Sequence, residues 1–311
     1  GDGGNAYIGG GYQGSDENLQ NASYTFVADG ANISADAGGV GDGGEVIIWS
    51  DRSTKFYGEI SARGGSESGN GGFLEISSKQ GLDSRGSIDV SATDGDHGTI
   101  LYDPLDIVIN GGSLDGDDSE AGDSATLLQQ DGATAGTIVF SDTPDTFNIY
   151  ESEIENTNAD IILQARNSIT VTGTFDNDAD GGGGVDPGTG VLLISNNNAL
   201  TLETRNATGD DIGATKPSGI DLTGVDIKTR GSKSSGFDTD ITIGTGTAGD
   251  GTAAPIVLDS VQATGDGNVF ITSEGSVTLN DTVSSAITNV TINAVGNISI
   301  GGAVTAGGDD T

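Results

Sequence analysis

The chain contains no cysteine and no methionine, and it has a single histidine and a single tryptophan. The lack of cysteine excludes disulfide scaffolds, thiol enzymes, thiolate zinc sites and iron–sulfur clusters. Basic residues are also scarce: 11 lysines and arginines stand against 47 acidic residues, so the formal net charge is −36. This charge excludes a basic face for nucleic acid and opposes binding to anionic lipid. No apolar run approaches the roughly 20 residues of a membrane span. We therefore expect neither nucleic-acid partners nor membrane insertion.

Glycine and aspartate are abundant instead. Glycine accounts for 54 of the 311 residues, and aspartate outnumbers glutamate 36 to 11. Asp, Asn and Gly favour turns, whereas Glu, Lys, Ala and Leu favour helices. High net charge with low hydrophobicity is also typical of disordered chains. The valines and isoleucines, however, are clustered in short runs such as 45–49, 107–109 and 160–163. This clustering favours a folded, all-β protein.

A repeat of about 28 residues runs through the first third of the chain. Segment 43–50, a glycine pair followed by an apolar run, recurs at 71–78, 28 residues later. Segment 58–62 recurs at 86–90 with the same shift. One unit of this length cannot bury an apolar face alone, whereas units stacked about 4.8 Å apart bury a continuous core. The repeat therefore predicts a β-solenoid.

Alternation within the repeats assigns side chains to two faces, because successive side chains of a strand point in opposite directions. Aligned on the glycines, the first inward column contains Ala6, Val46, Leu74 and Ile100, and the second contains Ile8, Ile48, Ile76 and Tyr102. The positions between them are Tyr7, Ile47, Glu75 and Leu101. We predict that Ile48 and Ile76 are buried against each other, whereas Glu75 and Trp49 point outward, so that a substitution of Glu75 is near neutral.

Beyond about residue 112 the repeat is irregular, but short apolar runs continue. Strands are predicted at 136–140, 160–165, 168–172, 190–194, 199–203, 219–222, 240–243, 256–258, 268–272, 276–279, 289–293 and 297–300. One short helix is predicted at 124–130.

The predicted fold is therefore all-β, a right-handed parallel β-helix with protruding glycine- and aspartate-rich loops. Regular repeats would occupy residues 1–110, and a less regular continuation of the same solenoid would occupy residues 111–311. An antiparallel sandwich is the alternative, but sandwiches do not repeat their sequence at a fixed period.

Segments 41–50, 56–60, 71–77 and 98–104 resemble the filamentous-haemagglutinin-like exoproteins. These are large adhesins of two-partner secretion systems in Gram-negative bacteria, including cyanobacteria. The most specific part is the sequence Gly-Thr-Ile-Leu-Tyr-Asp-Pro at 98–104. The resemblance covers residues 1 to about 110 and, more weakly, 145–175. It implies a β-helix located outside the cell or at the bacterial surface. The secretion domain of the family, with its Asn-Pro-Asn-Gly signature, is not found, so we expect an internal stretch of such an exoprotein.

Three functions follow as hypotheses. The first is a structural and adhesive rod segment whose loops contact cells, matrix or carbohydrate, with neighbouring segments of the same exoprotein as further partners. The second is self-association, by end-to-end stacking of solenoids into an extracellular filament. The third is a polysaccharide lyase or hydrolase. His97 lies in a glycine-containing turn, and no nucleophile elbow, zinc-binding helix or phosphate loop occurs. We therefore expect no enzyme activity and no catalytic residue.

Calcium is the candidate cofactor. Asp176, Asp178 and Asp180 alternate before a glycine, which resembles the start of a calcium-binding loop. The EF-hand version needs a glutamate at its twelfth position, and Pro187 stands there, although Asp186 could supply a fourth carboxylate. The predicted metal ligands are therefore Asp176, Asp178, Asp180 and Asp186, and a solvated polar loop is the alternative. A second acidic loop at 115–123 has less defined spacing.

Overall fold

The computed structural model describes residues 1–111, 146–175, 190–194, 198–204, 218–229, 239–246 and 254–307. These residues form mainly parallel β-strands, which confirms the predicted all-β class. The described residues belong to two compact units. Gly1–Leu105 and residues 146–147 form the first unit, and residues 106–111 with the described segments from Asn148 onward form the second.

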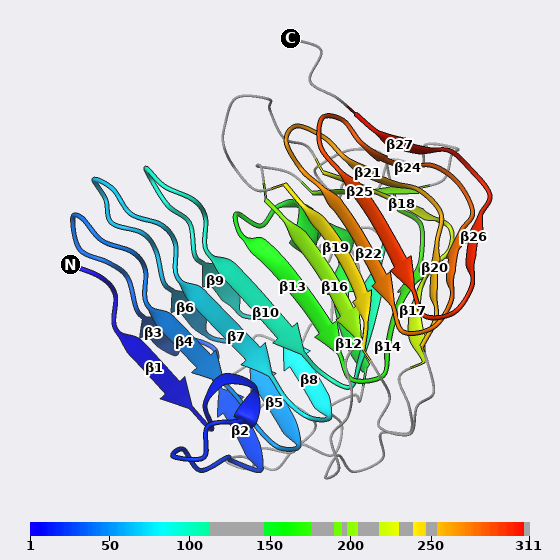
Figure 1. Ribbon diagram of the computed structural model, residues 1–311. Helices are drawn as coiled ribbons and strands as arrows, with labels where there is room; N and C mark the ends of the chain where they lie inside the picture. Colours follow the sequence, from blue (N-terminus) through cyan, green and yellow to red (C-terminus); the bar gives the residue numbers. More distant parts are fainter. Residues whose placement is uncertain are drawn as a thin grey trace. The chain divides into compact units, whose positions relative to one another are not determined.

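The first unit consists of three parallel sheets in which every third strand along the chain is a neighbour (Figure 1). The first sheet contains β1 (Asn5–Ile8), β4 (Glu45–Ile48), β7 (Phe73–Ser77) and β10 (Thr99–Asp103). The second contains β2 (Tyr24–Val27), β5 (Ser53–Phe56) and β8 (Gly81–Ser84), and the third contains β3 (Asn32–Ser34), β6 (Glu59–Ser61) and β9 (Ser87–Asp89). Each turn of the chain, here called a coil, thus adds one strand to each sheet, which is consistent with a β-solenoid.

The register of the first sheet is the one predicted from the glycine alignment. Ala6, Val46, Leu74 and Ile100 are in register, as are Ile8, Ile48, Ile76 and Tyr102. Ile48 and Ile76 are paired neighbours and neither has any exposed surface. Burial of an aliphatic side chain of this size contributes about 1.5–3 kcal/mol. The predicted core column between adjacent coils is therefore confirmed.

The prediction that Glu75 points to solvent is wrong, because its side chain is fully buried. Segment 9–23, which connects β1 to β2, crosses in front of the first sheet (Figure 1). It contains a 3-10 helix, η1 (Tyr12–Gly14). The backbone N–H of Gln13 in this helix donates to both carboxylate oxygens of Glu75, at 3.0 and 3.2 Å. The connection therefore covers a face that the alternation pattern assigns to solvent.

Trp49 is buried by the same connection, which corrects the second outward assignment. Gly14 lies so close to the indole that a Cβ there would be 2.4 Å from the Trp49 ring. Gly10 also approaches the ring, and its φ of +153° is one that side chains rarely adopt. The Thr25 hydroxyl donates to the Trp49 carbonyl oxygen at 2.6 Å. Glycine is required at these positions because the backbone of the connection packs directly on the indole.

The second unit also contains three parallel sheets. The first contains β13 (Asp160–Ala165), β16 (Leu200–Thr204), β19 (Ile241–Thr245), β22 (Val269–Ser273) and β25 (Val290–Ala294). The second contains β11 (Asp106–Asn110), β14 (Ser168–Thr172), β17 (Gly219–Leu222), β20 (Ile256–Leu258), β23 (Val277–Leu279) and β26 (Ile298–Ile300). The third contains β15 (Gly190–Ile194), β18 (Val225–Thr229), β21 (Val261–Ala263), β24 (Val283–Ser285) and β27 (Val304–Ala306). Strand β12 (Thr146–Tyr150) spans the boundary between the units.

The coils of the second unit become shorter toward the C-terminus. Ile161 pairs with Leu200, 39 residues later, and Ile241 pairs with Val269, 28 residues later. Val269 then pairs with Val290 after only 21 residues. The same 21-residue spacing separates β20 from β23 and β23 from β26. The second unit therefore ends in short, regular coils, which the sequence analysis treated as irregular.

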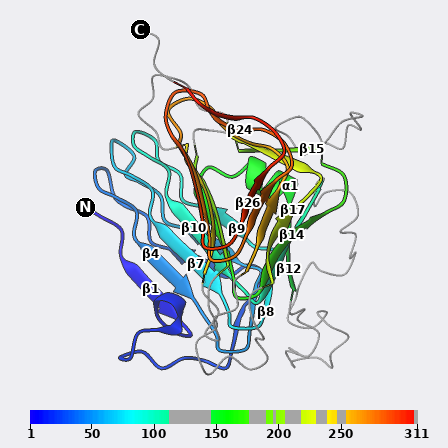
Figure 2. The same cartoon turned by 45° about the vertical axis from the view of Figure 1, so that its right-hand side comes forward.

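The predicted helix at 124–130 lies outside the described residues. A different short helix, α1 (Glu151–Glu155), follows β12 and contacts β15 (Figure 2). Its Ile154 side chain is buried, and the buried Glu155 carboxylate accepts a hydrogen bond of 2.7 Å from the N–H of Leu193. The helix thus covers part of the third sheet of the second unit.

Candidate functional site

Three loops of the first unit extend side by side (Figure 1). These finger loops, residues 36–43, 63–71 and 91–97, connect the third sheet to the first in consecutive coils. Each is closed by a backbone hydrogen bond of 2.8 Å from a glycine that follows the loop to the residue that precedes it. The donors are Gly44, Gly72 and Gly98, and the acceptors are the carbonyl oxygens of Ala35, Ala62 and Val90.

The glycine pairs of the repeat are explained by close approach between neighbouring coils. A Cβ at Gly43 would lie 2.1 Å from the Ala62 carbonyl oxygen, and one at Gly72 would lie 2.1 Å from the Gly44 carbonyl oxygen. Both distances are far below van der Waals contact, and both obstacles are backbone atoms. The paired glycines therefore allow the backbones of neighbouring coils to approach closely.

A column of polar side chains holds consecutive finger loops together. Asp2 Oδ1 accepts the N–H of Asp42 at 3.2 Å, Asp42 Oδ1 accepts the N–H of Asn70 at 2.7 Å, and Asn70 Oδ1 accepts the N–H of Asp96 at 2.9 Å. All four residues lie three positions before a strand of the first sheet. The side chain at this position of the repeat therefore accepts the same hydrogen bond from each following coil, which places the loops in register.

An ion pair adds to the contact between the first two finger loops. Arg63 Nη2 lies 2.7 Å from Asp36 Oδ2, and the N–H of Arg63 also donates to Asp36. Burial disfavours the charged carboxylate, but the hydrogen bonds from Arg63 outweigh it and lower the pKa of Asp36 to about 2. Asp36, in the first finger loop, therefore keeps its negative charge through most of the acidic pH range.

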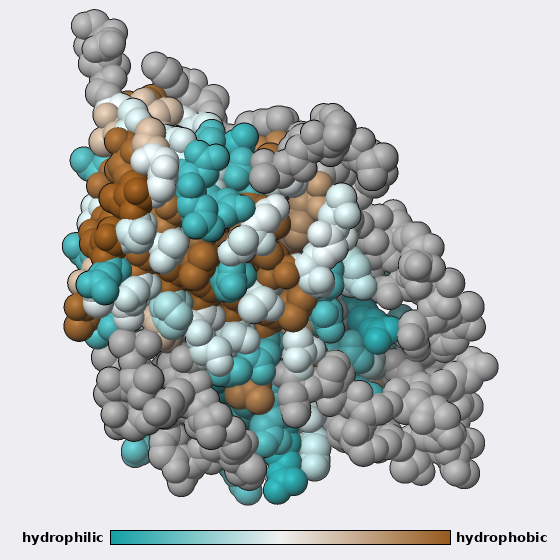
Figure 3. Space-filling view, turned by 90° about the vertical axis from the view of Figure 1, so that its right-hand side faces the viewer, coloured by the Kyte–Doolittle hydropathy of each residue, from teal (hydrophilic) through white to brown (hydrophobic). Residues whose placement is uncertain are grey.

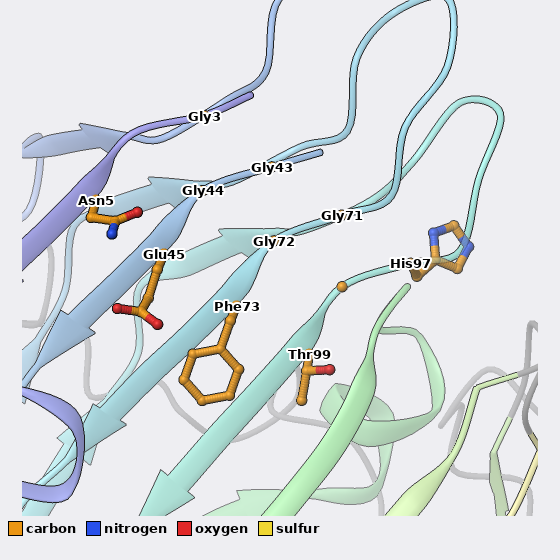
Figure 4. Close-up of a pocket in the computed structure, with 11 residues that line it drawn as sticks. Gly3, Asn5, Gly43, Gly44, Glu45, Gly71, Gly72, Phe73, His97 and Thr99 are labelled. Atoms are coloured by element: carbon orange, nitrogen blue, oxygen red, sulfur yellow. The ribbon is translucent and has the colours of Figure 1, made fainter. Parts of the chain in front are cut away.

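A groove of about 390 Å³ lies where the finger loops meet the first sheet. Two glycine pairs, Gly43–Gly44 and Gly71–Gly72, form one side of it with Gly3 and Gly98. Its side chains come from Asn5, Glu45, Phe73, Thr99 and His97. Figure 4 shows Asn5, Glu45, Phe73 and Thr99 following one another across the starts of the four strands. Their register confirms this line: each is the partner of the next in adjacent strands. The line thus presents one side chain from each coil.

Two exposed tyrosines lie beside the groove. Tyr7 is 44% exposed and Tyr12 is 47% exposed. The Tyr7 hydroxyl accepts a hydrogen bond of 3.1 Å from Asn5, and its hydrogen bond with Glu45 is the largest cause of a raised Tyr7 pKa. The ring of Tyr12 contacts that of Phe73, with centroids 5.8 Å apart. The groove therefore combines aromatic surface with hydroxyl, amide and carboxylate groups.

His97 is half-buried at the end of the third finger loop. Its Nδ1 accepts a hydrogen bond of 3.3 Å from the N–H of Ala92, in the same loop. Burial lowers the pKa of His97, which favours the neutral imidazole that can accept this bond. The contact gives His97 a part in holding the loop, in line with its assignment to a turn.

The predicted calcium ligands Asp176, Asp178, Asp180 and Asp186 lie outside the described residues, as does the acidic loop at 115–123. Within the described segments, no group of three or more His, Asp or Glu side chains is arranged to hold a metal ion. The structure therefore brings together a different set of residues, those of the groove. The sequence analysis missed it because the exposed tyrosines come from β1 and from an insertion that has no counterpart in the later repeats.

No protein-family model matches the chain, and no curated protein matches its sequence. The resemblance to filamentous-haemagglutinin-like exoproteins therefore stays a prediction. Helix α1 has five residues, and none of the helices in the described parts of the chain is long and apolar enough to cross a membrane.

Proposed function

We propose that the chain is a structural and adhesive segment of a secreted or surface-displayed bacterial exoprotein, built as a right-handed parallel β-helix. The observation that carries the proposal is the coil-on-coil pairing, parallel and in register within each unit. Crossovers between parallel strands are right-handed in about 98% of cases. Each coil adds about 4.8 Å along the axis, so the length of a solenoid grows by one strand spacing with every coil.

The finger loops support an adhesive rather than a purely spacing role. They project from consecutive coils in register, and the ladder of Asp2, Asp42, Asn70 and Asp96 fixes their spacing. Solenoids commonly use such ordered loops and extended faces for contacts. In this proposal the partners are carbohydrate or the surface of another cell, and the chain is not an enzyme. Turnover of a neutral or acidic polysaccharide by the purified protein would contradict the last point.

Two measurements test the proposal: the shape of the chain in solution and its adhesion to cells. Small-angle scattering of the full chain should give the extended profile of a single rod, because the two units would continue one solenoid. Beads coated with the chain should adhere to bacterial or host cells more than beads coated with an acidic protein of similar charge. A compact scattering profile contradicts the rod, and adhesion equal to that of the control beads contradicts the adhesive role.

Self-assembly into a filament is the second candidate, and one observation favours it. The last described coil exposes Val295, Ile298, Ile300 and Val304, with exposed fractions of 76%, 45%, 50% and 43%. The residues that pair with three of them in the preceding coil, Val277, Leu279 and Val283, are buried. Figure 3 shows hydrophobic side chains gathered on the side of the molecule that carries β26 in Figure 1. In this candidate a coil from a second copy covers these side chains and pairs with the strand edges, as the next coil of a longer exoprotein also would.

Sedimentation over a range of concentrations tests the filament. End-to-end stacking predicts assemblies that lengthen with concentration and are abolished by Ile298→Lys with Ile300→Lys. The matched control is Ser66→Lys with Thr93→Lys, since these exposed neutral residues lie on finger loops and belong neither to the first coil nor to the last. A monomer at all concentrations, or equal loss in both double variants, contradicts stacking through the last coil.

Calcium binding at Asp176, Asp178, Asp180 and Asp186 is a separate proposal that rests on the sequence alone. Binding to the folded state would stabilise it by about 2.7 kcal/mol at a hundred times the dissociation constant. Calcium should then raise the melting temperature, and sodium at matched ionic strength should not. An unchanged calcium response after Asp178→Ala with Asp180→Ala would exclude this loop as the site.

A further inference from the structure

We propose that the groove at the base of the finger loops binds a neutral polysaccharide, laid across β1, β4, β7 and β10. The proposal rests on the adhesive function proposed above and names a ligand class for one site. Its chemistry comes from a line of four side chains, Asn5, Glu45, Phe73 and Thr99, and from the two exposed tyrosines beside them. Each of these groups is one that carbohydrate recognition uses.

The spacing between the four side chains of the line matches the repeat length of a polysaccharide. Asn5, Glu45, Phe73 and Thr99 occupy one register position of the first sheet. Neighbouring strands lie about 4.8 Å apart, so the line offers one side chain at each such interval. A hexose in an extended polysaccharide advances the chain by a similar length. Successive sugar units could therefore meet successive side chains without a change in the ligand's conformation.

The tyrosines supply the apolar part of the contact. A hexose presents a face of C–H groups as well as a rim of hydroxyls, and an aromatic ring offers a flat apolar surface with a polar tip. Tyr12 and Tyr7 keep nearly half of their surface exposed, and Tyr12 lies against Phe73 in the line. A sugar seated beside Phe73 would thus contact an aromatic surface and still reach the neighbouring polar groups.

The aromatic surface is held in place before any ligand arrives. The N–H of Gln13 is bound by the buried Glu75 carboxylate, which anchors the turn that carries Tyr12. Asn21 Nδ2 donates to the Gly14 carbonyl oxygen at 2.9 Å and closes the same connection. Because the turn that carries Tyr12 is positioned in advance, binding costs less ordering entropy.

Charge selects neutral over acidic polymers. Glu45 contributes a carboxylate to the groove, and the chain carries a formal net charge of −36. A uronic-acid polymer would bring further carboxylates to this surface and would be repelled within a Debye length of about 8 Å at physiological salt. Sugar hydroxyls, in contrast, can donate to Glu45 and Asn5 and accept from Asn5 and Thr99.

The experiment is affinity electrophoresis of the full chain in gels that contain soluble mixed-linkage β-glucan, mannan or dextran, with alginate as the acidic polymer. At least one neutral polymer should retard the protein and alginate should not. Tyr7→Ala with Tyr12→Ala should weaken the retardation roughly tenfold or more, as truncation of aromatic anchors does at other binding sites. Tyr24→Ala is the matched control: Tyr24 is 45% exposed but lies on β2, outside the groove.

Thermal melts establish that the variants are folded, and Asn5→Ala provides a second variant if the tyrosine pair destabilises the unit. The proposal is overturned if no neutral polymer retards the wild-type chain, if alginate retards it equally, or if Tyr24→Ala loses as much affinity as the groove variants. Bead adhesion measured in parallel separates this proposal from the adhesive function. Adhesion without glycan binding overturns only the groove, and glycan binding without adhesion overturns only the function.

Discussion

The first unit and the last coils of the second unit contain similar strands but differ in the number of residues in each coil. Both add three strands per coil, and in both the inward positions hold aliphatic residues. After a first interval of 40 residues, which includes segment 9–23, the first unit spaces equivalent residues 28 and 26 apart, whereas the last coils space them 21 apart. A coil therefore needs about 21 residues for its strands and corners, and the additional residues of the first unit form the finger loops.

The two regions also differ in what covers them. In the first unit, segment 9–23 buries Glu75 and Trp49 on the outer face of the first sheet. In the last coil, inward-facing Ile298 and Ile300 stay about half exposed. Burial of a given position thus depends on what lies over it as much as on strand alternation. Substitutions at equivalent positions of the two regions can test this directly.

The largest expected effect is at the core column. Ile76→Asp should lower the free energy of unfolding by about 3–5 kcal/mol, because it buries an unpaired carboxylate between coils. Ile298→Asp, on the last coil, should cost less than about 1 kcal/mol because its side chain is 45% exposed. Denaturant unfolding followed by circular dichroism measures both. Equal costs would show that the inward face of the first sheet is wrongly assigned.

Glu75 is the next test, since the structure reverses the expectation that its substitution is neutral. Glu75→Ala removes the acceptor of the Gln13 N–H from a buried site and should cost about 1.5–3 kcal/mol, the range for hydrogen bonds to charged groups. Segment 9–23 should also be cleaved faster by protease. Glu67→Ala is the control, because Glu67 is exposed on a finger loop and should stay within about 0.5 kcal/mol. Similar stability of the two variants would contradict the covering role of the connection.

A glycine in each unit tests whether close approach explains the paired glycines. Gly72→Ala places a Cβ 2.1 Å from the Gly44 carbonyl oxygen and should cost about 1–3 kcal/mol through overpacking. Gly244→Ala, in β19 of the second unit, places a Cβ no nearer than 3.8 Å to any neighbour and should stabilise by about 0.4–1 kcal/mol. Thermal melts compare the two variants with the wild type. A neutral Gly72→Ala would mean that the coils can separate to admit a side chain.

The sequence predicts the parts of the fold that follow a local rule. Glycine pairs at a fixed spacing predict the register of the first sheet, because the same close approach recurs in each coil. Strands β18, β21, β24 and β27 in the third sheet of the second unit are not predicted. Three of them have only three residues, such as Val-Gln-Ala and Val-Ser-Ser, so their apolar content is too low to stand out. Their pairing is imposed by the strands of neighbouring coils.

The groove escapes prediction for a related reason. Asn5, Glu45, Phe73 and Thr99 differ in residue type, and only the register of four strands brings them into line. Tyr12 reaches Phe73 through a connection that occurs in one coil. A repeat is detected from the positions at which its copies have similar residues, whereas the groove consists of positions at which the copies differ.

The smallest expected effect concerns pH and the finger loops. Asp36 has a pKa lowered from 3.8 to about 2, so its stabilising contribution is fully present above the unfolded value and is lost as the pH falls through 2. Arg63→Gln removes the partner and should reduce the loss of stability between pH 5 and pH 2. The difference should stay below about 1 kcal/mol, because Arg63 is 53% exposed and solvent screens the pair.

Arg85→Gln is the matched control for this pH profile. Arg85 pairs with Asp83 within a single strand segment at 2.9 Å, so its loss leaves the contact between finger loops intact. Melting temperatures recorded from pH 5 to pH 2 should therefore change their slope in Arg63→Gln and not in Arg85→Gln. An unchanged slope in Arg63→Gln would mean that the finger loops are held without the ion pair, by hydrogen bonds such as those that the Asp42 and Asn70 side chains accept from the next loop. In that case the spacing of the loops would depend on hydrogen bonds between coils and not on the ion pair.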